Sequence, residues 1–351
     1  MKKILVTGGA GFIGSNFIIS MLKKHDDITI LNLDALTYCG NLKNLSEVED
    51  DDRYAFVRGD ITDHGLVERL FDENDFDWVV NFAAESHVDR AILDPNIFVT
   101  TNVLGTANLL ASARRVWEEN GTWKEGVKFL QVSTDEVYGS LGAEGFFVET
   151  TPLDPHSPYS AAKASADLIV KSYADTFGMP VNITRCSNNY GPFQFPEKLI
   201  PLMITNCLSH KDLPVYGDGL QVRDWLYVDD HCKAIDMVLR SGLPGETYNI
   251  GGHNERTNID IVKTIIKHIN EAADDAVGEH LIKHVQDRKG HDRRYGIDPE
   301  KIKTELGWYP ETGFDEGIKL TIDWYLNNRD WINEIVSGEY EKYYELQYGG
   351  R

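Results

Sequence analysis

The sequence predicts an α/β protein with a Rossmann-type doubly wound parallel sheet and a smaller, mixed C-terminal lobe. Short apolar runs that are typical of buried strands alternate with amphipathic helical stretches through the first half of the chain. The first of these runs leads directly into a glycine-rich turn and then a helical pattern. After about residue 190 the regular alternation gives way to prolines and short elements, which indicates a second, less regular lobe.

The bulk composition bounds the class of protein. The 351 residues include 56 acidic and 35 basic side chains, so the net charge is −21, which argues against sequence-independent binding of nucleic acid. Cys39, Cys186, Cys207 and Cys232 show no CxxC spacing, and we expect them to be reduced thiols in or near the core. No apolar run is long enough to span a membrane, and the run after Met1 is too short for a secretion signal. We therefore expect a cytoplasmic protein.

The predicted first strand, Lys2 to Thr7, is followed by glycines at positions 8, 11 and 14 and by a helix from Ser15 to Lys24. Glycines at Gly8, Gly11 and Gly14 would permit a tight turn and a close approach of backbone to a pyrophosphate. The helix N-terminus would then offer free N–H groups to the anion. A glycine triplet alone is weak evidence, because ordinary turns also use glycine.

Asp34 strengthens the dinucleotide interpretation. It ends the next predicted strand, Ile28 to Leu33, about 20 residues after the loop, where a carboxylate would bind the adenosine ribose. A carboxylate there repels a 2′-phosphate, so NAD is favoured over NADP. Asp60, after the strand Tyr54 to Arg58, has two equally weighted interpretations: an acceptor for the adenine amino group, or the N-cap of the following helix.

The strand Trp78 to Phe82 ends in small residues, Ala83 and Ala84, which would let a cofactor pass close by. Ser86 and His87 follow and could face the ligand, although a lone Ser-His pair does not make a triad. A long amphipathic helix is predicted from Asn102 to Trp117.

Two adjacent acids, Asp135 and Glu136, come directly after the apolar run Val127 to Val132. The carboxyl ends of parallel strands are where ligands bind in such sheets, and two acids there raise one another's pKa. We interpret them as a general acid and a general base. Tyr159 and Lys163 are four residues apart on the next predicted helix, which runs from Ser157 to about Phe177, and so share one face. A lysine so placed, together with the positive charge of oxidised nicotinamide, would favour the tyrosine phenolate, although a surface Tyr/Lys pair is a common alternative.

The second half supplies candidate ligand contacts. Asn188 and Asn189 follow the strand Val181 to Cys186 and offer uncharged amides. Lys198 and Arg223 are candidate clamps for a diphosphate, or else surface charges. A last sheet strand is predicted at 247–250, a helix at 258–270, and a strand and turn from Pro214 to Gly219 that includes Tyr216.

The basic run 287–294, which contains His291, would either close on phosphates or form a solvated loop. His280 and His284 share a predicted helical face, but no carboxylate partner accompanies them, and we expect no metal site. The tail from Phe314 is predicted to be helical, with aromatics packing against the body (Trp324, Trp331, Tyr340, Tyr343, Tyr344 and Tyr348).

In combination these motifs resemble the extended short-chain dehydrogenase/reductase superfamily, on the glycine loop with Tyr159-x-x-x-Lys163. Within it, Thr134-Asp135-Glu136 is similar to the signature of the dTDP-glucose 4,6-dehydratases. So are the stretches 83–90, 185–192, 197–201 and 223–225. The similarity runs from Met1 to about Trp308, and the tail beyond carries no motif.

The resemblance implies a nucleotide-diphosphate sugar substrate, tightly bound NAD that is regenerated in each turnover, and a homodimer built on two helices per subunit. It implies that Asp135 is the acid, Glu136 the base, and Thr134, Tyr159 and Lys163 further catalytic residues. Together with the glycine loop and Ala83, the expected NAD contacts are Gly8, Gly11, Phe12, Ile13, Gly14, Asp34, Thr37, Asp60, Ile61, Ala83, Ala84, Ser86, Thr101, Tyr159, Lys163 and Asn189. The expected substrate contacts are Ser86, Thr134, Asn188, Lys198, Leu199, Pro214, Tyr216, Arg223, Asn258 and His291.

The implied organisation is an NAD-binding Rossmann domain over 1–190 and a mostly substrate-binding lobe over 191–351. A strand near 247–250 and its adjoining helix return to the first domain, so the two are interleaved. The implied reaction is dehydration of dTDP-glucose to dTDP-4-keto-6-deoxyglucose, a precursor of rhamnose-type deoxysugars. A UDP-glucose 4,6-dehydratase, a nucleotide-sugar 4-epimerase or decarboxylase, and a non-enzymatic NAD sensor remain alternatives.

Overall fold

The computed structural model describes residues 1–287 and 291–336. A seven-stranded parallel sheet lies at its centre, in the order β12-β8-β7-β4-β1-β2-β3. The strands are β1 (Lys2–Thr7), β2 (Ile28–Asp34), β3 (Tyr54–Arg58), β4 (Trp78–Asn81), β7 (Lys128–Thr134), β8 (Val181–Cys186) and β12 (Thr247–Ile250). The strand order reverses between β1 and β4, and this switch point is where open parallel sheets bind ligands. The predicted doubly wound fold is confirmed.

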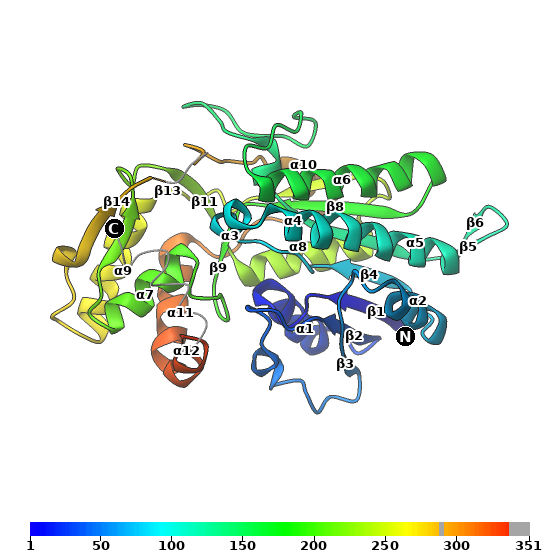
Figure 1. Cartoon of the computed structure of the whole chain (residues 1–351), viewed down its shortest axis with the longest axis horizontal. Coiled ribbons are helices and arrows are strands. Elements are labelled where there is room, and N and C mark those ends of the chain that lie inside the picture. The colour runs from blue at the N-terminus through cyan, green and yellow to red at the C-terminus, as the bar shows by residue number, and fades with distance from the viewer. Residues whose placement is uncertain (288–290, 337–351) are drawn as a thin grey trace.

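Helices cover both faces of this sheet (Figure 1). One apolar layer packs α1 (Phe12–Lys24), α8 (Val228–Ser241) and α10 (Glu300–Leu306) on the sheet. The other layer contains α2 (His64–Glu73), α5 (Thr106–Trp117) and α6 (Pro158–Phe177). The strands are buried on both sides, which explains why they read in sequence as continuous apolar runs rather than alternating ones.

The smaller lobe lies beside one end of the sheet (Figure 1) and has its own apolar core. Its sheets are β13-β11-β9 and the parallel pair β10-β14. These strands are β9 (Asn188–Tyr190), β10 (Leu213–Tyr216), β11 (Val222–Tyr227), β13 (Glu255–Thr257) and β14 (Ile282–Val285). Its helices are α7 (Leu199–Leu208), α9 (Asn258–Ala272), α11 (Phe314–Asn327) and α12 (Arg329–Val336).

The predicted helix from Asn102 to Trp117 is one part of a longer, irregular stretch. It is preceded by α3 (Val88–Leu93) and α4 (Pro95–Phe98), and the segment η2 (Val99–Gly105) is π-helical before α5 begins. Asn102 lies in the π-helical segment, and its amide accepts from the backbone N–H of Glu85 and donates to the carbonyl of the same residue. The irregular turn therefore anchors the loop that follows β4.

The prediction that His280 and His284 share a helical face is wrong. His280 lies in a short 3-10 turn, η4 (Glu279–Leu281), and His284 lies in strand β14. Val285 and its neighbours pair in parallel with β10, so backbone pairing to a distant strand overrides the local helical spacing.

The described part of the tail is helical and packs on the body, as predicted. Trp324 and Trp331 make edge-on contacts with each other and with Phe193. Trp331 also donates its indole N–H to Asn44. Tyr340, Tyr343, Tyr344 and Tyr348 lie outside the described residues. The four cysteines are unpaired, and all except the half-buried Cys39 are buried. Among the described helices, none is both long and apolar enough to cross a membrane.

Candidate active site

The acid pair sits on a tight turn at the carboxyl end of a central strand. Strand β7 ends at Thr134, and η3 (Asp135–Tyr138) is a 3-10 turn whose first amides are capped by the Thr134 hydroxyl, 3.3 Å from the N–H of Glu136. Gly139 then takes φ +85°, and a Cβ there would stand 2.4 Å from the carbonyl oxygen of Asp154. Only glycine can occupy this position at the end of the turn, so the backbone conformation of the turn depends on Gly139.

Two adjoining cavities open at this turn, one of about 550 Å³ and one of about 170 Å³. Glu136 contributes to the walls of both. Asp135 lines neither of them and is buried, so the two neighbouring carboxylates occupy different environments. The residues shared by the two walls are Ser86, Glu136, Asn188, Asn189, Gln194, Glu197 and Lys198.

All of the predicted NAD contacts line the larger cavity. Its floor is the glycine loop, where a Cβ on Gly8 would stand 2.6 Å from the backbone nitrogen of Ala83, and one on Gly14 2.4 Å from the carbonyl of Gly8. Helix α1 begins here with Gly11 as its N-cap, and no side chain caps its first amides. Bare backbone and an uncapped helix N-terminus fit a pyrophosphate.

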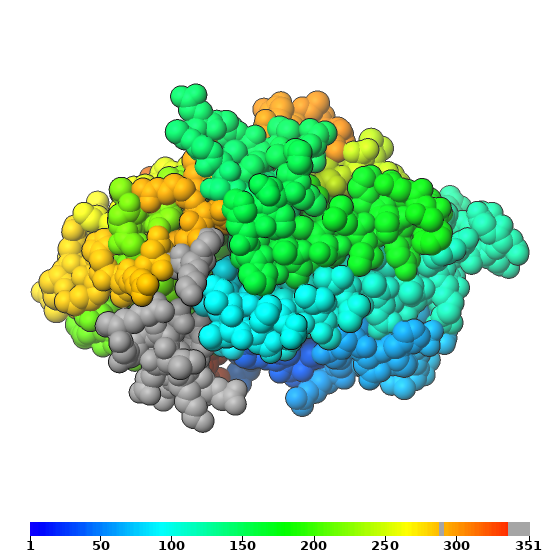
Figure 2. Space-filling view, turned by 45° about the horizontal axis from the view of Figure 1, so that its top comes forward, coloured from blue at the N-terminus to red at the C-terminus, as the bar shows by residue number. Residues whose placement is uncertain are grey.

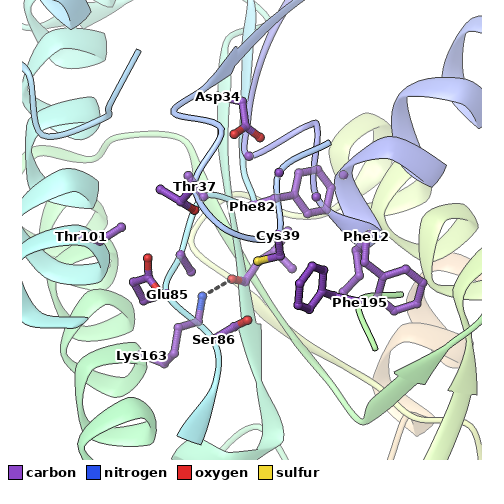
Figure 3. A pocket seen from close by; sticks show the side chains of 18 of the residues that line it. Phe12, Asp34, Thr37, Cys39, Phe82, Glu85, Ser86, Thr101, Lys163 and Phe195 are labelled. Atoms are coloured by element: carbon purple, nitrogen blue, oxygen red, sulfur yellow. Dashed lines mark hydrogen bonds between the residues drawn. The ribbon is translucent and has the colours of Figure 1, made fainter. Parts of the chain in front are cut away.

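The ends of the larger cavity are chemically different. Figure 3 shows Asp34 at one end of the view and Lys163 and Ser86 at the other, with Phe12 and Phe195 along one side. The carboxylate of Asp34 accepts from the backbone N–H groups of Ala10 and Leu36, at 2.9 and 2.8 Å, which fix it at the rim of the cavity. Asp60 accepts from Thr62 instead of capping α2, whose N-cap is Asp63. The N-cap interpretation of Asp60 is therefore wrong.

Tyr159 and Lys163 come together on one face of α6, as their spacing predicts, and both line the larger cavity. The Nζ of Lys163 donates to the carbonyl of Val132 at 2.6 Å, which brings α6 against β7. Burial raises the pKa of Tyr159 well above its usual value, and the neighbouring Glu136 adds to this effect. Burial also lowers the pKa of Lys163. The chain by itself therefore favours the neutral phenol, so the expected phenolate requires the positive charge of oxidised nicotinamide in addition to Lys163.

Burial, followed by the negative charges of Glu136 and Asp224, raises the pKa of Asp135 well above the ordinary value. Its Oδ1 lies 3.3 Å from the Thr134 hydroxyl, and its Oδ2 has no hydrogen-bond partner among the described residues. An unsatisfied buried carboxyl oxygen is costly when ionised, so the protonated form is favoured. The environment thus separates the pair into a buried Asp135, whose protonated form is favoured, and a Glu136 that lines both cavities.

Asn189 is held by a residue that the sequence did not single out. The ring Nδ1 of His231 lies 2.8 Å from its Oδ1, and its amide nitrogen donates to the carbonyl of Ser187. Burial lowers the pKa of His231 to about 3, so the ring is neutral and its Nδ1–H donates to the amide oxygen. The amide of Asn189 therefore has a fixed orientation at the cavity wall.

The smaller cavity collects the predicted substrate residues. With the exception of Thr134, which lines the larger cavity, all of them contribute to its wall. The guanidinium of Arg223 donates to the carbonyls of Val222 and Asp292 and stacks on Tyr295, 4.1 Å from the ring centre. The Nζ of Lys198 donates to the carbonyl of Ser86 at 2.8 Å. Both cations therefore lie at the cavity rather than on the open surface.

Comparison with known proteins bears on this arrangement. A family model described as GDP-mannose 4,6 dehydratase matches residues 5–321. A dTDP-glucose 4,6-dehydratase from Xanthomonas campestris pv. campestris is 53% identical over 344 residues, 97% of each chain. The crystal structure of a dTDP-glucose 4,6-dehydratase from Bacillus anthracis in complex with NAD superposes with a TM-score of 0.86 at 49% identity, over 95% of this chain and 100% of that one. The Streptomyces venezuelae enzyme of the same name, with NAD and TYD bound, gives a TM-score of 0.87 at 45% identity, over 95% and 99%.

The chain belongs to the dTDP-glucose 4,6-dehydratase family.

The family match extends further than the motifs indicated. The sequence motifs end near Trp308, but the family model reaches residue 321 and the Xanthomonas relative spans 97% of the chain. The described tail helices α11 and α12 therefore belong to the family's common length, even though no short motif marks them. Their contribution is apolar packing, which leaves a diffuse signal in sequence.

The larger cavity also contains two acids that the sequence analysis did not identify as site residues. Glu85 and Glu197 both line the larger cavity, and burial raises the pKa of each. Arg90 contacts Glu197 at 3.2 Å and stacks on Tyr38, whose hydroxyl donates to the same carboxylate at 2.9 Å. Both acids lie in stretches that resemble the dehydratase family, 83–90 and 197–201, but those stretches did not show that the two side chains line the cavity.

Proposed function

We propose that this protein converts dTDP-glucose to dTDP-4-keto-6-deoxyglucose with NAD, by oxidation at C4, loss of water across C5 and C6, and return of the hydride to C6. The product would feed the synthesis of rhamnose-type deoxysugars. The observation that carries the proposal is the position of Glu136: it lies at the junction of a dinucleotide-shaped cavity and a second cavity, beside Tyr159 and Asp135. The high identity to dehydratases over almost the whole chain supports it.

The larger cavity would hold NAD, and the residues present fit it. The bare glycine loop would accept the pyrophosphate, Asp34 would bind the adenosine ribose, and Asp60 and Ile61 would contact the adenine. Thr37, Thr101 and Asn189 lie along the same wall. When bound, NAD supplies a hydride acceptor for C4, a hydride donor for C6, and a positive charge beside Tyr159.

Tyr159, ionised to the phenolate beside the positive charge that bound NAD would supply, would take the proton of the sugar 4-hydroxyl, and Thr134 would hold the developing keto oxygen. The two residues interact closely enough for the threonine hydroxyl to oppose the rise in the pKa of the phenol. Lys163, donating to the carbonyl of Val132, would hold the face of α6 that presents Tyr159. Ser86 lies on the wall common to both cavities, where it would meet cofactor and sugar alike.

The new ketone acidifies the C5 proton, which Glu136 would remove. Asp135, protonated because of its burial, would give its proton to the departing 6-hydroxyl, and the two move off together as water. The proton taken by Glu136 would then return to C5 when the hydride returns to C6. Each assisted proton transfer contributes roughly 10²–10⁴-fold to the rate.

The smaller cavity would bind the nucleotide sugar. Arg223 and Lys198 would neutralise the diphosphate, and Asn188, Asn258 and His291 offer polar groups around it. Apolar contacts come from Leu199 and Pro214, and Tyr216 completes the set. The assignment makes residues 1–190, with β12 and its adjoining helix, the NAD-binding domain and most of 191–351 the substrate lobe.

We also propose a homodimer in the cytoplasm. Leu104 and Leu168 are 59% and 58% exposed, on η2 and α6, two elements that contact each other. Figure 2 shows the cyan and green segments that contain them side by side on one face. Large apolar side chains at such exposure support a second copy covering this face.

The test is incubation of the purified protein with dTDP-glucose and, separately, with UDP-glucose, followed by mass spectrometry of the products. Loss of one water from dTDP-glucose alone is the expected result. Loss from UDP-glucose alone would make the protein a UDP-glucose 4,6-dehydratase. A chromatographically distinct product of unchanged mass would indicate an epimerase, and in a third incubation with a nucleotide-linked uronic acid sugar loss of carbon dioxide would indicate a decarboxylase; either would overturn the proposal.

A further inference from the structure

The residues proposed for redox chemistry and those proposed for dehydration lie on different elements. Tyr159 and Lys163 are on helix α6, whereas Asp135 and Glu136 are on the turn η3 after β7. Both must act on one sugar ring within a few tenths of an ångström of the productive geometry. Something must therefore fix the turn relative to the helix.

Arg185 spans the two elements from strand β8. Its Nε donates to Oδ2 of Asp167 on α6 at 2.9 Å, and its Nη1 donates to the hydroxyl of Tyr138 on η3, also at 2.9 Å. All three side chains are buried, with exposed fractions of 6%, 1% and 2%. None of them lines either cavity. The guanidinium fork is suited to this task, because its donors leave in fixed directions.

The far side of Tyr138 is also fixed. Its hydroxyl donates to Oδ1 of Asn249 on β12 at 2.8 Å, and its ring stacks on Phe147 with centres 5.0 Å apart. Asn249 in turn donates to the backbone carbonyl of Phe147. The last residue of the acid–base turn is therefore held from β8 and from β12.

Asp167 also reaches back toward the redox pair. It lies one helical turn after Lys163 on α6, and its charge favours the protonated form of that lysine, opposing burial. Arg185 holds Oδ2 of this buried carboxylate, and its Oδ1 has no hydrogen-bond partner among the described residues. The chain of hydrogen bonds runs from Asp167 on α6 through Arg185 to Tyr138 on the turn that carries the acid pair, and the influence of Asp167 on Lys163 is electrostatic.

We propose that Arg185 is a positioning residue that fixes the acid–base turn η3 relative to helix α6 through Asp167 and Tyr138. The proposal rests on the dehydratase function proposed above. Because Tyr159 is anchored independently by its own helix, loss of the Arg185–Tyr138 link should misplace Asp135 and Glu136 while leaving oxidation at C4 nearly intact.

The decisive variant is Tyr138→Phe, which removes the hydroxyl and both of its hydrogen bonds while keeping the ring that stacks on Phe147. Tyr248→Phe is the matched control, because Tyr248 is also fully buried and its hydroxyl also makes two hydrogen bonds, with Glu305 and the N–H of Leu243. Tyr248 lines neither cavity.

Single turnovers, quenched rapidly and analysed by mass spectrometry, separate the two steps. The 4-keto intermediate is two hydrogen atoms lighter than the substrate, and the dehydrated product is one water lighter. We expect Tyr138→Phe to slow water loss roughly ten- to a hundredfold, so that the keto intermediate accumulates, with KM and the oxidation rate changed less than about threefold. Tyr248→Phe should follow the wild-type time course.

Arg185→Lys provides a second test, because a lysine ammonium cannot donate to Asp167 and Tyr138 in the two fixed directions that the guanidinium uses. It should give the same selective loss of dehydration, and the double variant with Tyr138→Phe should be no slower than the slower single variant, because both break one link. Equal slowing of both steps, or no selective effect of Tyr138→Phe relative to Tyr248→Phe, would overturn the proposal. Failure of the wild-type protein to dehydrate dTDP-glucose would refute the proposed function instead.

Discussion

Replacement of Asp135 by asparagine tests two consequences of burying this carboxyl: its ability to donate a proton and its pH-dependent cost to the stability of the fold. Asparagine has nearly the same shape, but it has no proton to transfer to a departing hydroxyl. Since burial favours the protonated form of the carboxyl, the substitution removes an acid while leaving the favoured, uncharged state of the site nearly unchanged. The surrounding turn should therefore keep its course.

The kinetic magnitude follows from the role of a single positioned acid. Its loss should lower the rate of water elimination roughly 10²–10⁴-fold. The rate of C4 oxidation should change little, because Tyr159 and Lys163 stand on α6 and are untouched. The keto intermediate should accumulate in quenched single turnovers.

The same substitution has a thermodynamic signature. Below the ordinary pKa of 3.8 the Asp135 carboxyl is protonated in folded and unfolded chains alike. As the pH rises above that value, the unfolded chain ionises first while the folded chain retains the proton, so the free energy of unfolding falls. Each unit by which the folded-state pKa is raised costs about 1.4 kcal/mol once the pH exceeds both values. Asp135→Asn removes this cost.

The assay is thermal unfolding of wild type and variant between pH 4 and pH 7, beside the quenched turnovers. The Tm of the wild-type protein should fall more steeply with rising pH than the Tm of Asp135→Asn. Asp236→Asn is the control for turnover, because it removes a buried carboxyl paired with Lys24 and Arg240 and should lower Tm without affecting elimination. Parallel Tm curves for wild type and Asp135→Asn, or near-normal elimination by the variant, would refute the reasoning.

Four further outcomes are expected. Tyr159→Phe should abolish formation of the keto intermediate, since the ring remains but no group accepts the 4-hydroxyl proton; unchanged oxidation would remove Tyr159 from this role. Glu136→Gln should retain NAD and slow elimination roughly 10²–10⁴-fold, and normal water loss would contradict its assignment as base. Gly14→Ala should lose bound NAD on gel filtration, because the methyl group would stand 2.4 Å from a backbone carbonyl of the loop; full retention would argue against the cradle. Leu104→Glu with Leu168→Glu should give monomers by light scattering, and a persistent dimer would place the interface elsewhere.

Local features of this chain were readable in the sequence because neighbouring residues determine them. The glycine spacing, the strand before it and the helix after it form one continuous stretch, and the structure places that stretch at the cavity floor. The spacing of Tyr159 and Lys163 was sufficient to place both on one helix face. The failures came where distant pairing overrode local spacing, as at His284, which pairs with β10 instead of lying on a helix.

Packing between distant segments decided the chemical state of the site. The sequence shows two adjacent acids, but not that Asp135 is buried and lines neither cavity while Glu136 lines both. Glu85 and Glu197 are 112 residues apart and meet only through the fold, as do Arg90 and Glu197. The pKa of a buried carboxyl depends on which side chains exclude water from it, and here those side chains come from segments that are far away in the chain.

The sequence by itself determined the family, the doubly wound fold class and the residue types that carry the chemistry, because these are properties of short motifs and their spacing. The tertiary structure alone decided that Asp135 is buried while Glu136 lines both cavities, and how Arg185 joins α6 to the acid–base turn. Those outcomes depend on burial and on hydrogen bonds between β8, α6 and η3. No stretch of neighbouring residues contains that information, because the three elements meet only when the chain has folded.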